Sequence, residues 1–221
     1  MRVEGSFSVY PVRAIIVMGV GGCGKTTIGT RLAHLLGDAP FIDADALHSA
    51  ECVEKMSKGH PLTDSDRWPW LGRVREEIEK VANKLVKNQD IPAAETRKIV
   101  EEHSHQPSLR YLYVVCACSS LKRSYRELLS RSDPDTTADA QTTHDTVFLY
   151  INVNKQELAR RLVVRPDHFF GLPMLDSQLE TLEPPDATRE AAIVVQGNNS
   201  VDDVVKDAYY KVTHYITKNS L

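Results

Sequence analysis

The residues with the clearest chemical signal lie near the amino terminus, where eight positions fit the pattern G-x-x-x-x-G-K-[ST]. They read Gly19-Val20-Gly21-Gly22-Cys23-Gly24-Lys25-Thr26. An apolar stretch, Ala14 to Met18, precedes them, and a helical pattern from Lys25 to Leu36 follows. The glycines let backbone N–H groups converge on phosphate oxygens, and the start of a helix adds partial positive charge. We therefore predict a loop that binds the phosphates of a nucleotide.

Side chains within this loop have separate predicted roles. Lys25 can reach the β and γ phosphates, and the Thr26 hydroxyl can ligate Mg²⁺. A glycine turn that only joins a strand to a helix explains the glycines but not Lys25 and Thr26 together. The guanine-reading N-K-x-D and the D-x-x-G of switch GTPases do not occur in the sequence, which disfavours a GTPase. The predicted nucleotide-binding residues of the loop are Gly19, Gly21, Gly22, Cys23, Gly24, Lys25, Thr26 and Thr27.

Two carboxylates, Asp43 and Asp45, stand at the end of the next β-type run. The carboxyl ends of strands border the ligand crevice in α/β proteins. One carboxylate there can hold a Mg²⁺-bound water, and the other can accept a hydrogen bond from an attacking hydroxyl. We assign Asp43 to the metal, together with Thr26, and Asp45 to catalysis as the base. The alternative is that one or both of these aspartates cap the next helix.

Short β-type runs alternate with helix-period runs, which indicates an α/β fold with a parallel β-sheet of about five strands and helices on both faces. The expected strands are Ala14 to Met18, Phe41 to Asp43, Tyr111 to Ala117, Val147 to Val153 and Ala192 to Val195. Long helices are expected from Lys25 to Leu36, from near Pro69 onward, and from Val201 to Lys218. The apolar face of the first comprises Ile28, Leu32, Leu35 and Leu36, and that of the second Trp70, Leu71, Val74, Ile78, Val81 and Leu85.

The composition is that of an ordinary globular protein, and 221 residues suit a single domain over positions 1–221. A net charge of −3 gives no general attraction for nucleic acid or anionic membrane. No apolar run approaches the roughly 20 residues that span a bilayer. The four cysteines show neither CxxC spacing nor the density of a disulfide scaffold. We predict a cytoplasmic protein without nucleic-acid or membrane partners.

Four further blocks of sequence follow the loop in a characteristic order. They are FIDADALH, EKMSKGHPLTDSDRWPWL, ACSSLKRSYRELL and HFFGLPMLDSQLETLEPP. Together with the loop they closely resemble the gluconokinase family of small P-loop kinases. Shikimate and adenylate kinases share the first loop but look different in the other blocks, so the resemblance is specific.

The resemblance implies a P-loop fold of the nucleoside-monophosphate and shikimate kinase type. It implies transfer of the γ-phosphate of ATP to the 6-hydroxyl of D-gluconate with Mg²⁺, and commonly a homodimer. Gluconate is a polyol with one carboxylate, so its pocket needs cations and hydrogen-bonding groups. The residues that match family positions near the substrate are Asp45, His48, Arg67, Lys122, Arg126, His168 and Gln178. The expected catalytic residues are Lys25, Asp45 and Arg126.

Lys122 and Arg126 share one face if SLKRSYRELL is a helix that begins near Ser119. Arg126 could then take the gluconate carboxylate bidentately, a geometry that lysine cannot supply. The alternative is a solvated basic face. Arg67 is expected in an extended segment that leads into the helix near Pro69. The reason is that Trp68, as the residue before that proline, disfavours the helical conformation.

A mobile lid is expected over about 158–180. Arg161 and Arg165 lie one turn apart there, and in kinases of this type such arginines reach the ATP phosphates as the lid closes. For each arginine alone, a surface charge explains the residue nearly as well. Two insertions, at about 88–110 and 131–145, have no counterpart in compact members of the family. The third strand ends without the aspartate of a Walker B motif, so Asp43 acting through water is the expected second Mg²⁺ contact.

Two other functions stay open on the sequence. A related kinase could use another sugar acid or polyol as its acceptor. A nucleotide-binding module could instead have kept ATP binding and lost phosphoryl transfer. Asp45, Lys122 and Arg126 argue against the second alternative, because a pure nucleotide binder needs no acceptor-side groups.

Overall fold

The computed structural model describes residues 12–87, 111–130, 144–163 and 172–219. Five strands in these ranges form one sheet in the order β2-β3-β1-β4-β5. All four neighbouring pairs are parallel, as predicted. Each expected strand is present, with its ends shifted by up to a few residues. The strands are β1 (Val12–Met18), β2 (Phe41–Asp43), β3 (Leu112–Ala117), β4 (His144–Asn152) and β5 (Ala192–Gln196).

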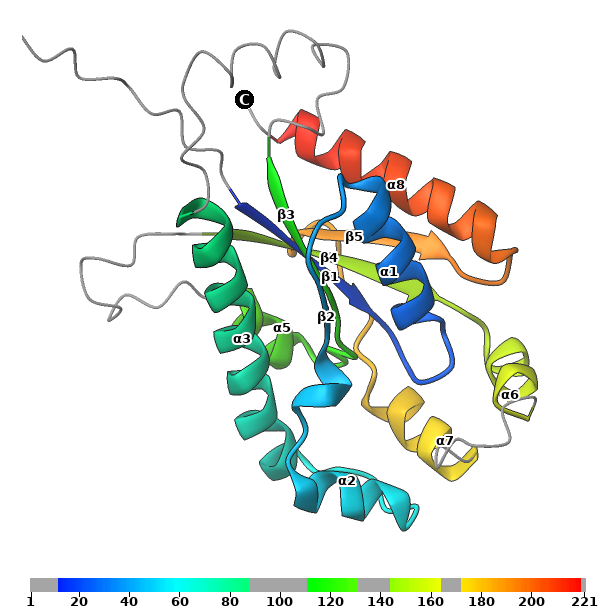
Figure 1. Ribbon diagram of the computed structural model, residues 1–221. Helices are drawn as coiled ribbons and strands as arrows, with labels where there is room; N and C mark the ends of the chain where they lie inside the picture. The colour runs from blue at the N-terminus through cyan, green and yellow to red at the C-terminus, as the bar shows by residue number, and fades with distance from the viewer. Residues whose placement is uncertain (1–11, 88–110, 131–143, 164–171, 220–221) are drawn as a thin grey trace, which may run out of the picture.

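Helices cover both faces of the sheet (Figure 1). Helices α1 (Lys25–Leu35) and α8 (Val201–Lys218) lie on one face, and α3 (Asp64–Lys87) and α5 (Arg123–Ser130) lie on the other. The remaining elements gather near the carboxyl ends of the strands. They are the 3₁₀ turn η1 (Ala44–Leu47) and helices α2 (Ala50–Ser57), α6 (Lys155–Val163) and α7 (Leu172–Thr181).

The central strand β1 divides its side chains between two hydrophobic layers. Ile15 and Val17 pack in the layer that contains Leu32 of α1. Ile16 packs in the opposite layer, together with Trp70 of α3. This alternation follows from the two-residue repeat of a strand, and burial of both faces explains why β1 is apolar throughout. The two layers fix β1, and with it the loop that follows.

The apolar face of α1 agrees with the sequence except at one position. Ile28, Leu32 and Leu36 are buried, whereas Leu35 is 45% exposed. Gly37, with a φ of 82°, follows the helix in the left-handed conformation that commonly ends one.

Helix α3 begins at Asp64, five residues before the predicted start near Pro69. The carbonyl of Thr63 accepts hydrogen bonds from the backbone N–H groups of Asp66 and Arg67, both at 3.1 Å. In return, the Asp66 carboxylate accepts from the Thr63 N–H at 2.6 Å. The Asp66 carboxylate, which also accepts from the Thr63 hydroxyl at 2.8 Å, thus caps the first turn by reaching back to the residue before the helix, and the helix begins here despite the proline within it. The extended approach predicted for Arg67 is therefore wrong, because Arg67 lies in the first turn of α3.

Helix α5 begins at Arg123, so the predicted start near Ser119 is also wrong. Ser120 has a φ of 45°, a left-handed conformation that a right-handed helix does not include. The Lys122 carbonyl accepts hydrogen bonds from the N–H groups of Tyr125 and Arg126, so Lys122 stands at the boundary of the helix.

The remaining sequence predictions concern the last helix, the two insertions, the cysteines and membrane-spanning segments. Helix α8 runs from Val201 to Lys218 as predicted. The insertion at 88–110 lies outside the described residues, and only 144 and 145 of the second insertion are described, as part of β4. All four cysteines are buried and free. In the described ranges, no helix combines the length and apolarity that crossing a membrane requires.

Candidate active site

The phosphate-binding loop joins β1 to α1, and its shape depends on its glycines. Gly19 and Gly24 have φ values of 143° and 101°, which other residues rarely adopt. A Cβ atom on Gly19 would lie 2.8 Å from Cys23 Sγ, closer than packing allows. Gly24 is the residue before α1, so the free N–H groups of the first helical turn lie beside the loop. The predicted order of strand, loop and helix is confirmed.

Two polar side chains, Lys25 and Gln178, form hydrogen bonds with the backbone of this loop. The Lys25 ammonium donates a hydrogen bond to the Val20 carbonyl at 3.2 Å, so Nζ is held over the loop. The Gly21 N–H donates to Gln178 Oε1 at 2.7 Å. Gln178 belongs to α7, which the sequence separates widely from the loop. The structure therefore brings a predicted substrate residue to the phosphate site itself.

The donor set near Thr26 fits Mg²⁺. The Thr26 hydroxyl lies 3.1 Å from Asp43 Oδ2, and Asp43 Oδ1 accepts a hydrogen bond from the Asp45 N–H at 3.1 Å. Oxygen ligands of this kind suit Mg²⁺, which usually keeps several waters and takes one or two protein ligands beside substrate phosphates. Among the described residues no group of three or more His, Cys, Asp or Glu side chains could hold a metal ion. Thr26 and Asp43 would supply two such oxygens beside the loop.

A cavity of about 380 Å³ extends from the loop towards α2, α3 and α7. It joins the predicted nucleotide side to the predicted acceptor side. The predicted residues that line it are Gly21, Gly22, Gly24, Lys25, Thr26, Thr27, Asp45, His48, Arg67 and Gln178. Sequence reasoning missed Ser57, Trp70, Ser119, Met174 and Ser177, which also line it. All five lie within the four blocks that resemble the family, which was the available signal.

Asp45 and His48 stand side by side on the acceptor side. Ser49, rather than Asp45, caps α2, so the capping alternative for Asp45 does not apply. The Asp45 side chain is 74% exposed, and its Oδ1 lies 4.0 Å from His48 Nε2. The His48 ring stacks on Trp70 at 4.3 Å between centroids. Burial lowers the pKa of His48, so at neutral pH it is an uncharged imidazole that can donate and accept hydrogen bonds.

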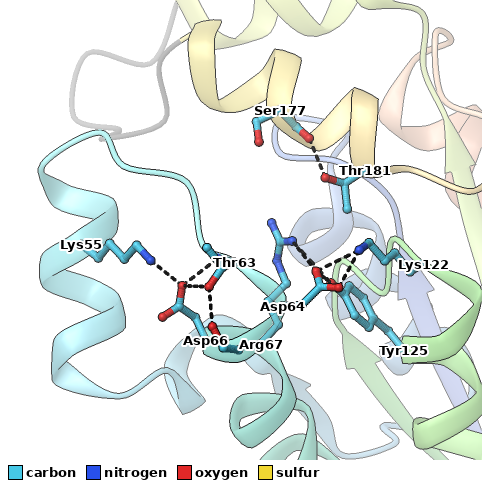
Figure 2. Close-up of polar contacts among 10 residues, drawn as sticks. Lys55, Thr63, Asp64, Asp66, Arg67, Lys122, Tyr125, Ser177 and Thr181 are labelled. Atoms are coloured by element: carbon cyan, nitrogen blue, oxygen red, sulfur yellow. Dashed lines mark hydrogen bonds and ion pairs between the residues drawn. The ribbon is translucent and has the colours of Figure 1, made fainter.

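Arg67 reaches the cavity from the first turn of α3, while Lys122 does not line it. The Lys122 ammonium is bound by Asp64, with Nζ to oxygen distances of 2.9 and 2.7 Å. Figure 2 shows Asp64 between Lys122, Tyr125 and Arg67, with the guanidinium of Arg67 extended towards α7. The structure therefore brings Arg67 and Lys122 into one cluster but leaves only Arg67 at the wall of the cavity.

Arg126 is placed away from this cavity, contrary to its predicted role at the substrate. Its side chain is 1% exposed, and its Nε and NH2 pair with the two carboxylate oxygens of Glu190 at 2.6 and 2.9 Å. NH1 donates to the carbonyls of Ser120, Leu121 and Glu183. Every guanidinium nitrogen is thus used inside the protein, and we assign Arg126 a structural role.

Arg161 borders a second cavity, of about 240 Å³, on the other side of the loop. Its guanidinium donates to the Cys23 carbonyl at 3.3 Å and to the Gly197 carbonyl at 2.6 Å, and pairs with Glu157 at 2.7 Å. The residue thus ties α6 to the loop and to the end of β5. Arg165 and His168, also predicted at the site, lie outside the described residues, as does part of the predicted lid.

No protein-family model matches the chain. Curated proteins do: a probable gluconokinase of Xenopus tropicalis is 37% identical over 198 residues, which cover 87% of this chain and 90% of that protein. A gluconokinase of Gluconobacter oxydans is 37% identical, with 88% of each chain covered. The thermosensitive gluconokinase of Escherichia coli is 34% identical, covering 87% of this chain and 83% of that protein.

Solved structures agree. A gluconokinase from Sinorhizobium meliloti superposes with a TM-score of 0.69 at 32% identity, over 96% of this chain and 97% of that one. The thymidylate kinase of Candida albicans, at 12% identity and a TM-score of 0.56, shares the fold. Because relatives at least 30% identical match most of both chains, this chain belongs to the gluconokinase family.

Proposed function

We propose that this chain transfers the γ-phosphoryl group of ATP to the 6-hydroxyl of D-gluconate, giving 6-phospho-D-gluconate and ADP. The observation that carries this proposal is the single cavity that the phosphate-binding loop shares with Asp45, His48 and Arg67. Family membership supplies the acceptor, and the cavity supplies a physical path between the two substrates. Transfer needs both in one site, since positioning and charge stabilisation account for most of phosphoryl-transfer catalysis.

Each side chain at this cavity has a chemical task in the proposed reaction. The loop N–H groups and Lys25 hold the phosphates and the charge that develops on them. The Asp45 carboxylate accepts the proton of the attacking hydroxyl. Arg67 pairs with the gluconate carboxylate, and neutral His48 hydrogen-bonds a hydroxyl of the polyol. Lys25 and Arg67 are the lysine and arginine side chains that line the cavity within the described residues, one on each side.

We further propose that Thr26 and Asp43 hold Mg²⁺, the first directly and the second through water. The proposal rests on the 3.1 Å contact between their oxygens beside the loop. When bound, the ion supplies positive charge for the phosphate oxygens. The tasks described for Lys25, Asp45 and Arg67 are performed by side chains of the protein and not by the ion.

The adenine of ATP is proposed to occupy the second cavity. Ile28, Val201 and Val204 form apolar walls of this cavity. Arg161 also lines it, and its hydrogen bond to the Cys23 carbonyl holds the cavity wall beside the loop. A site of apolar walls with few polar groups is typical for a planar base. We also propose that 158–180 includes a lid whose Arg165 approaches the phosphates, and that His168 approaches gluconate, both as expectations from the sequence.

The remaining expectations are a homodimer, a cytoplasmic location, a single domain over 1–221 and entry of the product into the pentose phosphate route. The homodimer and the metabolic route rest on resemblance to the family, whereas the single domain rests on chain length and the cytoplasmic location on composition and cysteine spacing. Sedimentation equilibrium measures the first of them directly.

Two alternatives make different predictions for one experiment. The first is a related kinase with another sugar acid as acceptor, and the second is a nucleotide-binding module without transfer. The experiment measures ADP release by the purified protein with ATP and Mg²⁺ across D-gluconate, other aldonates, shikimate and nucleoside monophosphates. We expect the highest kcat/KM with gluconate and loss of the activity when EDTA removes the metal. Gluconate that yields no more ADP than the acceptor-free control would reject the proposed function.

A further inference from the structure

Asp64 has no task in the proposed reaction, yet its carboxylate joins three side chains of the acceptor region. It accepts hydrogen bonds from Lys122 Nζ at 2.9 and 2.7 Å and from the Tyr125 hydroxyl at 2.5 Å. NH1 of Arg67 lies 3.9 Å from Asp64 Oδ1. Figure 2 shows the carboxylate at the centre of this group. Asp64 therefore links the first turn of α3 to Lys122 and Tyr125 at the start of α5.

The ordinary explanation for an aspartate in the first turn of a helix is stabilisation of the helix end. In α3, Asp66 performs that task. Its Oδ2 accepts from the Thr63 N–H at 2.6 Å and pairs with Lys55 at 2.5 Å. In Figure 2 the two carboxylates point to opposite sides, Asp66 towards α2 and Asp64 towards α5. Capping alone does not account for the contacts of Asp64.

The charges of this cluster leave one positive charge in excess, because Lys122 and Arg67 share a single carboxylate. Lys122 is held by Asp64 and lies 5.6 Å from the centre of the Tyr125 ring. Arg67 instead lines the cavity. Its side chain donates one hydrogen bond within the described residues, to the Tyr125 hydroxyl at 3.5 Å. The excess charge is thus presented to the cavity on a guanidinium with donors to spare, which suits an acceptor with one carboxylate.

The electrostatics keep this arrangement in place at neutral pH. The ammonium of Lys122 and then the hydroxyl of Tyr125 hold the pKa of Asp64 below its ordinary value. The Asp64 carboxylate is therefore ionised at neutral pH.

We propose that Asp64 is a positioning residue for the acceptor: with Tyr125 and Lys122 it holds the Arg67 guanidinium where it pairs with the carboxylate of the sugar acid. This inference rests on the proposed function and deepens it. Asp64 itself does not line the cavity and acts through Arg67. Lys122, predicted from the sequence to bind gluconate, becomes the counter-charge that keeps Asp64 in place.

The test is a double-mutant cycle of Asp64→Asn and Arg67→Ala. Asp64→Asn keeps the shape of the side chain and removes its charge. We expect it to raise the KM for gluconate about tenfold or more, while kcat changes by less than about threefold. The KM for ATP should stay at the wild-type value. In the Arg67→Ala background, Asp64→Asn should raise the gluconate KM no further, because it acts only through that guanidinium.

Two control variants separate positioning from general loosening of α3. Asp66→Ala removes the cap of the same helix turn, and we expect a lower Tm with a gluconate KM within about threefold of wild type. Glu77→Gln removes a half-buried acid that pairs with the exposed Lys80 on the same helix, and we expect wild-type values for both Tm and the gluconate KM. If Asp64→Asn fails to fold, Tyr125→Phe serves instead: it removes the hydroxyl that contacts both Asp64 and Arg67, and should raise the gluconate KM about threefold.

The outcomes distinguish this inference from the proposed function. Wild-type protein without gluconate-dependent ADP release would overturn the proposed function and the assignment of the acceptor with it. Wild-type activity together with an unchanged gluconate KM in Asp64→Asn would overturn the positioning role alone. An equal added loss in the Arg67→Ala background would overturn it as well, since it would mean that Asp64 acts independently of Arg67.

Discussion

The backbone of Asp45 is held in place by the side chain of Asp43, two residues earlier. The Asp43 carboxylate accepts the Asp45 N–H at 3.1 Å and so starts the 3₁₀ turn after β2. The same carboxylate contacts the Thr26 hydroxyl beside the loop. One side chain therefore fixes the distance between the proposed base and the proposed metal site. This is why two acids so close in the sequence can serve different chemical tasks.

Replacement of the proposed base tests this division of tasks. We expect Asp45→Asn to lower kcat about 10²-fold or more, because the amide cannot accept the proton of the hydroxyl. ATP affinity, measured by isothermal titration calorimetry, should change by less than about twofold. Asp207→Asn, on α8 and paired with Lys211, is the matched control and should keep wild-type kinetics. An Asp45→Asn variant with full turnover would show that another group takes the proton.

Single residues were predictable where a local motif defines their task. The loop residues follow from a contiguous pattern and its flanking elements, and the structure confirms the order of strand, loop and helix. Arg126 could not be assigned in this way, because its partner Glu190 lies 64 positions away and nothing local marks the pair. Lys122 was placed on the same face as Arg126 only by assuming that α5 begins early, and the left-handed Ser120 prevents that start.

Helix α3 illustrates what decides the start of an element. Pro69 and the tryptophan before it favour a boundary at that point, since proline lacks an N–H group and crowds the preceding turn. The contacts of the Asp66 carboxylate with Thr63 nevertheless begin the helix earlier. Burial of Trp70 and its Nε1 hydrogen bond to the Ala44 carbonyl, at 2.7 Å, hold the helix against η1. Tertiary contacts thus outweigh the local cost of the proline.

The capping carboxylate should make the stability of α3 depend on pH. Lys55 and Thr63 lower the pKa of Asp66 in the folded protein from its ordinary 3.8. The stabilisation is therefore present at pH above 3.8 and is lost as the pH falls towards the folded-state pKa. We expect Asp66→Ala to cost about 1 kcal/mol at pH 7, or roughly 2–4 °C in Tm. Thermal melts should show the difference from wild type shrinking below about pH 4, and a constant difference would contradict this account.

At the scale of the whole molecule, the Arg126–Glu190 pair joins segments that are distant in the sequence. Arg126 belongs to α5, which follows β3, and Glu190 stands just before β5. The guanidinium also binds the Glu183 carbonyl at 3.0 Å, so the segment between α7 and β5 is anchored to α5. Glu190 has a pKa below its ordinary value because of Arg126, as expected of an ionised partner.

Removal of this buried arginine should destabilise the fold rather than weaken acceptor binding. We expect Arg126→Ala to lower the free energy of unfolding by about 3–5 kcal/mol, because Glu190 keeps its charge without a partner. Urea unfolding measures the change. Arg123→Ala breaks an exposed pair with Glu127 and should change it by less than about 1 kcal/mol. A stable Arg126→Ala variant with a strongly raised gluconate KM would instead support the role predicted from the sequence.

The fold as a whole was predictable because its signals are periodic. Apolar strand runs and 3.6-residue helical stripes give the five strands and the α/β class, and the resemblance gives the family. The order of the strands in the sheet and the joining of α7 to the loop through Gln178 depend on contacts between distant residues. Such contacts leave no pattern within a sequence window, which is why the layout of the cavity emerged only from the structure.

The central place of β1 has a consequence for synthesis of the chain. β1 ends at Met18, but its two neighbours, β3 and β4, begin at Leu112 and His144. A chain that emerges from the ribosome therefore carries the phosphate-binding loop long before either strand that flanks β1 exists. Because parallel pairing between distant segments is slow and exposes strand edges, early amino-terminal fragments lack the support that shapes this loop. Nucleotide binding should thus be acquired late, once β4 has joined the sheet.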